Sequence, residues 1–111
     1  MRLVLQQMTY FVAVVEEGTF LRAAERCNIS QSAISQQIKA LEGRLGVPLL
    51  RRSGRGFELT EAGEYFYNRS RSLLRSVDTL TKRTREIGDQ AHSSLAVGYL
   101  HLSARLNSCK R

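Results

Sequence analysis

The chain has 111 residues, of which 42% are hydrophobic, and it carries a formal net charge of +7. This length supports one small core with an extension rather than two large domains. The positive charge favours a polyanion such as nucleic acid as the partner, although a membrane surface would also attract it. Because no apolar run approaches the roughly 20 residues that span a bilayer, and the start lacks a signal-peptide core, we expect a cytoplasmic protein without membrane segments.

Residues able to bind metals or to catalyse reactions are few and dispersed. Cys27 and Cys109 lie far apart, and no Cys/His cluster has the spacing of a zinc site. The only glycine cluster, Gly54-Arg55-Gly56, lacks the strand-to-helix context of a phosphate-binding loop. We therefore expect no enzyme, no metal site and no cofactor.

Two helices are predicted in the first part of the chain. Apolar residues at helical spacing, followed by Gly18 as a left-handed cap, predict a helix from Leu5 to Glu17. Thr19 is suited to cap a second helix that ends near Arg26. Ala23 and Ala24 in this helix would allow a neighbouring helix to approach closely.

The most informative stretch runs from Ser30 to Leu45. Asn28 tolerates a left-handed backbone in the short connection before it, and Ser30 is a suitable helix cap. Apolar residues at steps of four, three and four form one stripe, Ile34, Ile38, Leu41 and Leu45. The opposite face carries side chains that suit the edges of DNA bases: Gln31, Ser32, Ser35, Gln36 and Lys39. Two helices joined by so tight a turn predict a helix-turn-helix.

A basic hairpin is predicted next. Gly46-Val47-Pro48 ends the helix, Leu49-Leu50 begins an edge strand, and Phe57-Glu58-Leu59 alternates as the return strand. Residues 51–56 between the strands contain three arginines and two glycines, which is typical of a hairpin tip. We interpret this hairpin as a basic wing, with a solvated loop as the alternative.

A long helix capped by Thr60 is predicted from Glu61 until about Gly88, the next helix breaker. Steps of four and three, the spacing of a coiled-coil seam, relate Phe66, Ser70, Leu73, Val77, Leu80, Thr84 and Ile87. About 28 residues would extend roughly 42 Å, further than a small core can cover. We predict that this helix pairs with a second copy, while packing of residues 65–74 onto the first helix is the alternative.

Several separate segments together resemble the LysR-type transcriptional regulators in order and spacing. These segments are Tyr10–Phe20, Ala23–Arg26, Ser30–Ile38, Leu41-Glu42, Leu45–Leu50 and Leu59–Gly63. The similarity covers about residues 5–87 and weakens through Tyr99. It implies a winged helix-turn-helix, a long linker helix that pairs in a dimer and, in complete members, a C-terminal effector-binding domain that drives tetramer formation.

The resemblance also implies where DNA bases are contacted. The positions that match the start of the family's third helix are Gln31, Ser32, Ser35 and Gln36, and those that match the wing and its approach are Arg52 and Arg55. Ser32 stands where the family usually has proline, and Gln36 where it commonly has arginine. Because glutamine suits adenine whereas arginine suits guanine, the family's target sequence is not transferred.

The combined expectation is a mainly α fold, a winged helix-turn-helix with a two-stranded wing and a long C-terminal linker helix. Residues 1–60 would form the DNA-binding domain, residues 61–90 the dimerisation helix, and residues 91–111 the start of a truncated effector domain or a disordered tail. The candidate DNA-binding residues are Ser30, Gln31, Ser32, Ser35, Gln36, Lys39, Arg52 and Arg55. The candidate dimerisation residues are Phe66, Leu73, Val77, Leu80 and Ile87.

The expected function is that of a transcriptional regulator that binds an interrupted palindrome in double-stranded DNA as a homodimer. A coiled-coil interaction module without DNA binding is the alternative, and it would explain the seam but not the arginine-rich hairpin. We expect no small-molecule effector for this chain, and a tetramer only with a full effector domain.

Overall fold

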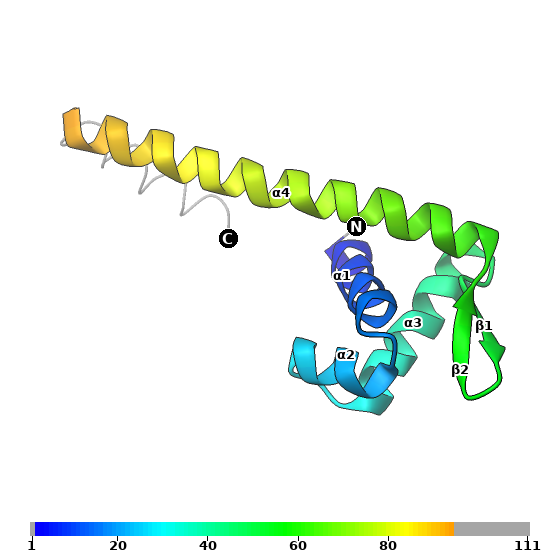
Figure 1. Cartoon of the computed structure of the whole chain (residues 1–111). Helices are drawn as coiled ribbons and strands as arrows, with labels where there is room; N and C mark the ends of the chain where they lie inside the picture. The colour runs from blue at the N-terminus through cyan, green and yellow to red at the C-terminus, as the bar shows by residue number, and fades with distance from the viewer. Residues whose placement is uncertain (1, 95–111) are drawn as a thin grey trace. The chain divides into compact units, whose positions relative to one another are not determined.

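The computed structural model describes residues 2–94 (Figure 1). Its elements in chain order are α1 (Arg2–Glu17), α2 (Phe20–Cys27), α3 (Gln31–Leu45), β1 (Leu50–Ser53), β2 (Gly56–Leu59) and α4 (Glu61–Ser94). The described residues up to Leu74 form one compact unit, and α4 from Arg75 onward belongs to a second. The predicted fold class, mainly helical with a two-stranded wing, is confirmed.

The ends of α2 and α3 are fixed by the predicted capping residues. The N–H of Arg22 donates to Thr19 Oγ1 at 3.1 Å, and the N–H of Ala33 donates to Ser30 Oγ at 3.1 Å. Asn28 ends α2 with a left-handed backbone at φ +58°. Each cap satisfies a main-chain group that a helix end leaves unpaired, so the turn from α2 to α3 stays short.

The core of the first unit lies where α1 packs against α2 and α3. Its fully buried large side chains include Phe11, Val14, Ile34 and Leu41. Full burial of a side chain of this size contributes about 1.5–3 kcal/mol. The predicted stripe of α3 faces this core except at its last member, Leu45, which is exposed. The core therefore fixes which face of α3 remains available to a partner.

The wing is an antiparallel pair in which β1 and β2 place Arg51 opposite Glu58 and Arg52 opposite Phe57. Directly paired residues point to the same side of a sheet, and successive residues point to opposite sides. Phe57 packs edge-on against Phe20 of α2, with ring centroids 5.7 Å apart. Arg52 therefore shares the inward side of the wing with Phe57, while Arg51 lies on the outward side.

The start of α4 is held tightly against the segment before the wing. Thr60 Oγ1 accepts a hydrogen bond from the N–H of Gly63 at 2.9 Å and donates to the carbonyl of Pro48 at 2.8 Å. A Cβ atom at Gly63 would overlap the carbonyl oxygen of Leu49. Glycine is therefore required at this position by the close approach of the two backbones.

Two predicted helix boundaries were wrong. The first helix begins at Arg2 rather than Leu5, since no breaker precedes Leu5. The last helix continues through Gly88 to Ser94. One interior glycine costs only about 0.5–1 kcal/mol relative to alanine, which does not end a long helix without a second stop signal. Residues 95–111, most of the segment predicted to begin a truncated effector domain or to form a disordered tail, lie outside the described residues, and Cys109 is among them.

The predicted seam of α4 divides into two parts. Phe66 packs edge-on against Phe11 with ring centroids 5.6 Å apart, and Ser70 is buried, so this part joins the core of its own chain. That arrangement is the alternative foreseen for residues 65–74, and it gives Phe66 a partner within the chain. The later seam residues Leu73, Val77, Leu80 and Ile87 have exposed fractions of 55%, 45%, 66% and 58%.

Candidate nucleic-acid interface

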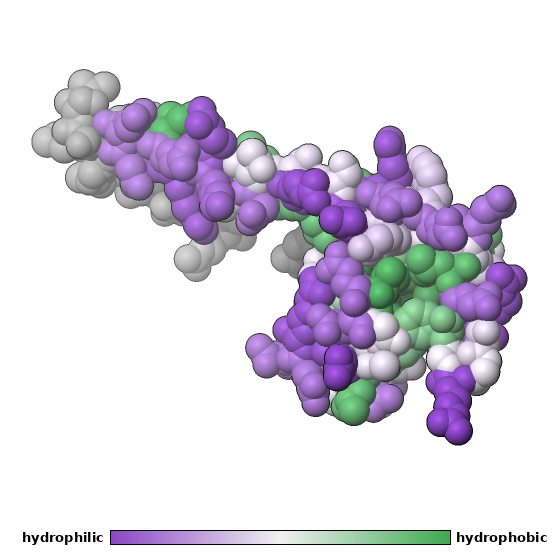
Figure 2. All heavy atoms as spheres, viewed as in Figure 1, coloured by the Kyte–Doolittle hydropathy of each residue, from purple (hydrophilic) through white to green (hydrophobic). Residues whose placement is uncertain are grey.

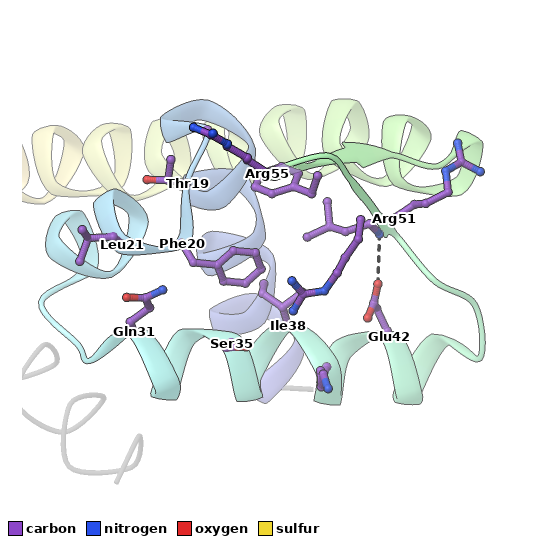
Figure 3. Close-up of a pocket in the computed structure, with 15 residues that line it drawn as sticks. Thr19, Phe20, Leu21, Gln31, Ser35, Ile38, Glu42, Arg51 and Arg55 are labelled. Atoms are coloured by element: carbon purple, nitrogen blue, oxygen red, sulfur yellow. Dashed lines mark hydrogen bonds between the residues drawn. The ribbon is translucent and has the colours of Figure 1, made fainter.

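A pocket of about 450 Å³ lies between the start of α2, the outer side of α3 and the wing (Figure 3). Phe20, Ile38 and Phe57 supply apolar parts of its lining. Figure 2 shows apolar residues between the helices and the wing, with hydrophilic residues around them and at the wing tip. The pocket is thus a concave surface with an apolar base and a polar rim.

Five of the eight candidate DNA-binding residues line this pocket: Gln31, Ser35, Lys39, Arg52 and Arg55. Ser32 and Gln36 are exposed on α3 beyond the pocket lining. The Ser30 hydroxyl accepts the capping hydrogen bond at the start of α3, so its first role is structural. The fold therefore brings α3 and the wing, separate in sequence, onto one surface.

The arginines of the wing differ in their partners. Arg51 Nη2 lies 3.6 Å from Glu58 Oε1, and Ser53 Oγ donates to Glu58 Oε2 at 2.9 Å. Within residues 2–94, Arg52 and Arg55 have no ion pair with an acidic side chain. Both are exposed, so their guanidinium groups are available to an anion such as a phosphate.

Glu42 holds the wing next to α3. Its Oε2 atom accepts the main-chain N–H groups of Leu49 at 2.7 Å and Leu50 at 3.1 Å, as the dashed line to β1 in Figure 3 illustrates. Hydrogen bonds to a carboxylate are stronger than neutral ones. Glu42, which also lines the pocket, therefore positions the first strand of the wing. Sequence reasoning did not identify this role, because no periodic or capping pattern marks it.

A second carboxylate, Glu16 of α1, contacts side chains of both α2 and α4. It accepts a hydrogen bond from the Tyr67 hydroxyl at 3.0 Å, and its oxygens lie 3.0 Å from Arg26 Nη2 and 3.6 Å from Arg71 Nε. The hydrogen bond with Glu16 raises the pKa of Arg26. Burial, and then the hydrogen bond to Glu16, raise the pKa of Tyr67. These contacts hold α1, α2 and the start of α4 together.

Sequence reasoning also missed the start of α2 as part of this surface. Thr19, Phe20 and Leu21 line the pocket together with residues of α3 and the wing. The predicted helix-turn-helix places the end of α2 next to the start of α3, but it does not indicate that the start of α2 faces the wing.

The described residues contain no cluster of three or more His, Cys, Asp or Glu side chains arranged to hold a metal ion. Burial raises the pKa of the free Cys27 thiol, which favours its protonated, unreactive form. Between residues 2 and 94, no helix combines the length and apolarity required to cross a bilayer.

Residues 5–64 match the family model described as bacterial regulatory helix-turn-helix protein, lysR family. The chain belongs to this family. It is 46% identical over 94 residues to the HTH-type transcriptional regulator BudR of Klebsiella aerogenes, covering 85% of this chain and 66% of that protein. It is 42% identical over 96 residues to the probable cat1 operon transcriptional activator of Acinetobacter lwoffii, covering 86% of this chain and 32% of that protein. This LysR-family chain thus spans about a third of the second relative.

Solved structures of this family share the fold. The BenM_DBD/catB site 1 DNA complex matches with a TM-score of 0.72 and 42% identity over 75% of this chain and 92% of that chain. The CbnR_DBD–DNA complex matches with a TM-score of 0.69 and 43% identity over 75% of this chain and 95% of that chain. This LysR-family chain therefore has the winged helix-turn-helix fold of DNA-binding domains, and its relatives are transcriptional regulators rather than enzymes.

Proposed function

We propose that this chain is a sequence-specific transcriptional regulator that binds an interrupted palindrome in double-stranded DNA as a homodimer in the cytoplasm. Each protomer would insert α3 into a major groove, with Arg52 and Arg55 on phosphates or in the minor groove. The observation that carries the proposal is the shared surface of polar α3 side chains and two arginines, Arg52 and Arg55, that pair with no acidic side chain among residues 2–94. The similarity to two DNA-bound LysR-family domains supports it.

Affinity and sequence choice would come from different parts of this surface. Cationic side chains on phosphates supply affinity for any sequence, whereas side chains on base edges supply discrimination. Gln31, Ser32 and Gln36 are exposed on the first two turns of α3 and carry hydrogen-bonding groups suited to base edges. The wing and Lys39 would position α3 in the groove.

The dimer would form along the exposed seam of α4. Leu73, Val77, Leu80 and Ile87 repeat at the spacing that one helix buries against another. Two protomers related by a twofold axis would present two α3 helices to two half-sites, which explains the proposed palindrome.

Arg55→Ala tests the phosphate contact. In gel-shift titrations of the full chain on mixed-sequence DNA, the slope of log affinity against log salt should fall by about 0.9 for each protomer that loses one phosphate contact. Arg51→Ala is the matched control, since Arg51 pairs with Glu58 and should change the slope less. An unchanged slope for Arg55→Ala would contradict the contact, and a chain that fails to bind DNA would favour the coiled-coil interaction module.

Gln36→Ala tests sequence readout on sites selected from random DNA by the wild-type chain. The variant should lose about 1–3 kcal/mol of binding free energy on the selected site and much less on random DNA. Gln6→Ala, an exposed glutamine of α1, should leave both affinities unchanged. Equal weakening on both DNAs would rule out a base contact by Gln36.

A further inference from the structure

Leu21 is an exposed leucine on the pocket side of α2. It lies in the first turn of that helix with an exposed fraction of 54%, whereas its neighbour Phe20 packs against Phe57 of the wing. Leu21 therefore contributes little to the core. Its side chain lines the same pocket as Gln31 and Ser35 of α3.

The surroundings of Leu21 limit what it can contact. Figure 3 shows Leu21 on α2 and Gln31 at the start of α3 on the same side of the pocket. Lys39, Arg52 and Arg55 line the same pocket, so charge complementarity favours DNA as its occupant. A leucine cannot form a hydrogen bond with a base edge. The apolar group that base edges present in the major groove is the C5-methyl group of thymine.

We propose that Leu21 contacts a thymine methyl group next to the base pair that Gln31 faces, and so adds a specificity contact from α2. This inference rests on the proposed function, since it requires α3 to lie in the major groove. It extends the base-contacting surface from α3 to the start of α2. The selected half-site should then contain a thymine whose methyl group, rather than its hydrogen-bonding edge, determines affinity.

The test combines a change in the protein with a change in the DNA. Sites selected by the wild-type chain are resynthesised with each thymine replaced, one at a time, by uracil, which removes only the methyl group. At one thymine of the half-site, wild-type affinity should fall about fourfold, because burial of a methyl-sized group contributes about 0.8 kcal/mol and 1.4 kcal/mol is tenfold. Leu21→Ala should bind the thymine and uracil forms of that site equally.

Leu45→Ala is the matched control, because Leu45 is 41% exposed and lies outside the pocket lining. This variant should keep the wild-type preference for thymine over uracil. Uracil sensitivity that persists in Leu21→Ala would overturn the proposal. A half-site at which no uracil substitution weakens wild-type binding would also overturn it. So would an equal loss of affinity by Leu21→Ala for the thymine and uracil forms, since this would indicate a contact with the DNA backbone. A wild-type chain that binds no DNA would instead overturn the proposed function, and with it this contact.

Discussion

The two parts of α4 use the same seam spacing in different environments. Of the seam residues before Leu74, Phe66 and Ser70 pack against the core of their own chain, whereas Leu73 is already exposed. From residue 75 to residue 90, every residue except Gly88 is exposed, including Val77, Leu80 and Ile87. A 3.5-residue spacing therefore identifies a face that another element covers, but it does not identify that element.

Leu80→Glu should have the largest effect, and it tests the exposed part of the seam. If Leu80 is buried against a second copy, its replacement removes about 1.5–3 kcal/mol of apolar burial per protomer, so the dimer dissociation constant should rise at least tenfold. Sedimentation velocity over a range of concentrations measures this change.

Lys82→Gln is the control for that measurement. It changes the charge by the same amount and lies on the opposite face of α4, since two residues at 100° each turn the helix by about 200°. This variant should dimerise as the wild type does. A Leu80→Glu chain that remains fully dimeric would show that the seam is not the interface.

Gly63→Ala tests the part of α4 that packs against its own chain. A Cβ atom would overlap the carbonyl oxygen of Leu49, so the variant should lose about 1–3 kcal/mol of unfolding free energy. Gly43→Ala is the matched control, because nothing lies near its Cβ position and α3 is helical there; it should gain about 0.5–1 kcal/mol. Urea unfolding compares the two, and equal stability of Gly63→Ala and the wild type would contradict the close approach.

Tyr67→Phe should have the smallest effect. It tests the hydrogen bond that joins the packed part of α4 to Glu16 of α1. Loss of the 3.0 Å hydrogen bond to Glu16 should cost about 0.5 kcal/mol, the low end for such bonds, since the site is exposed and Glu16 keeps Arg26. Tyr65→Phe removes the hydroxyl of a more exposed tyrosine and should be neutral in thermal unfolding. Equal melting temperatures for both variants would show that the hydrogen bond from Tyr67 to Glu16 does not stabilise the fold.

Local signals predicted much of the fold. Thr19 and Ser30 were identified as caps and Asn28 as a left-handed residue, because each role depends on one side chain and its own main chain. The alternation of Phe57, Glu58 and Leu59 likewise predicted the return strand, in which Phe57 and Leu59 are partly buried and Glu58 is exposed.

Contacts between distant segments were not predictable in the same way. Glu42 pairs with main-chain groups of the segment that leads into β1, and Phe66 finds Phe11 across the fold. The sequence pattern does not identify either contact. Helical periodicity shows which face of α4 is apolar, and a carboxylate shows only that a hydrogen-bond donor or a cation is required nearby. The place of Leu21 at the candidate interface depends in the same way on how α2 and α3 pack.

Selection of bound sites from random DNA by the full chain tests base contacts by α3 and dimer formation in one measurement. If a dimer inserts both α3 helices, the selected DNA should contain two inverted half-sites whose centres are separated by one helical turn of DNA or a multiple of it. Enrichment of a single half-site without an inverted copy would contradict the dimer, and no enrichment of any sequence would contradict base contacts by α3.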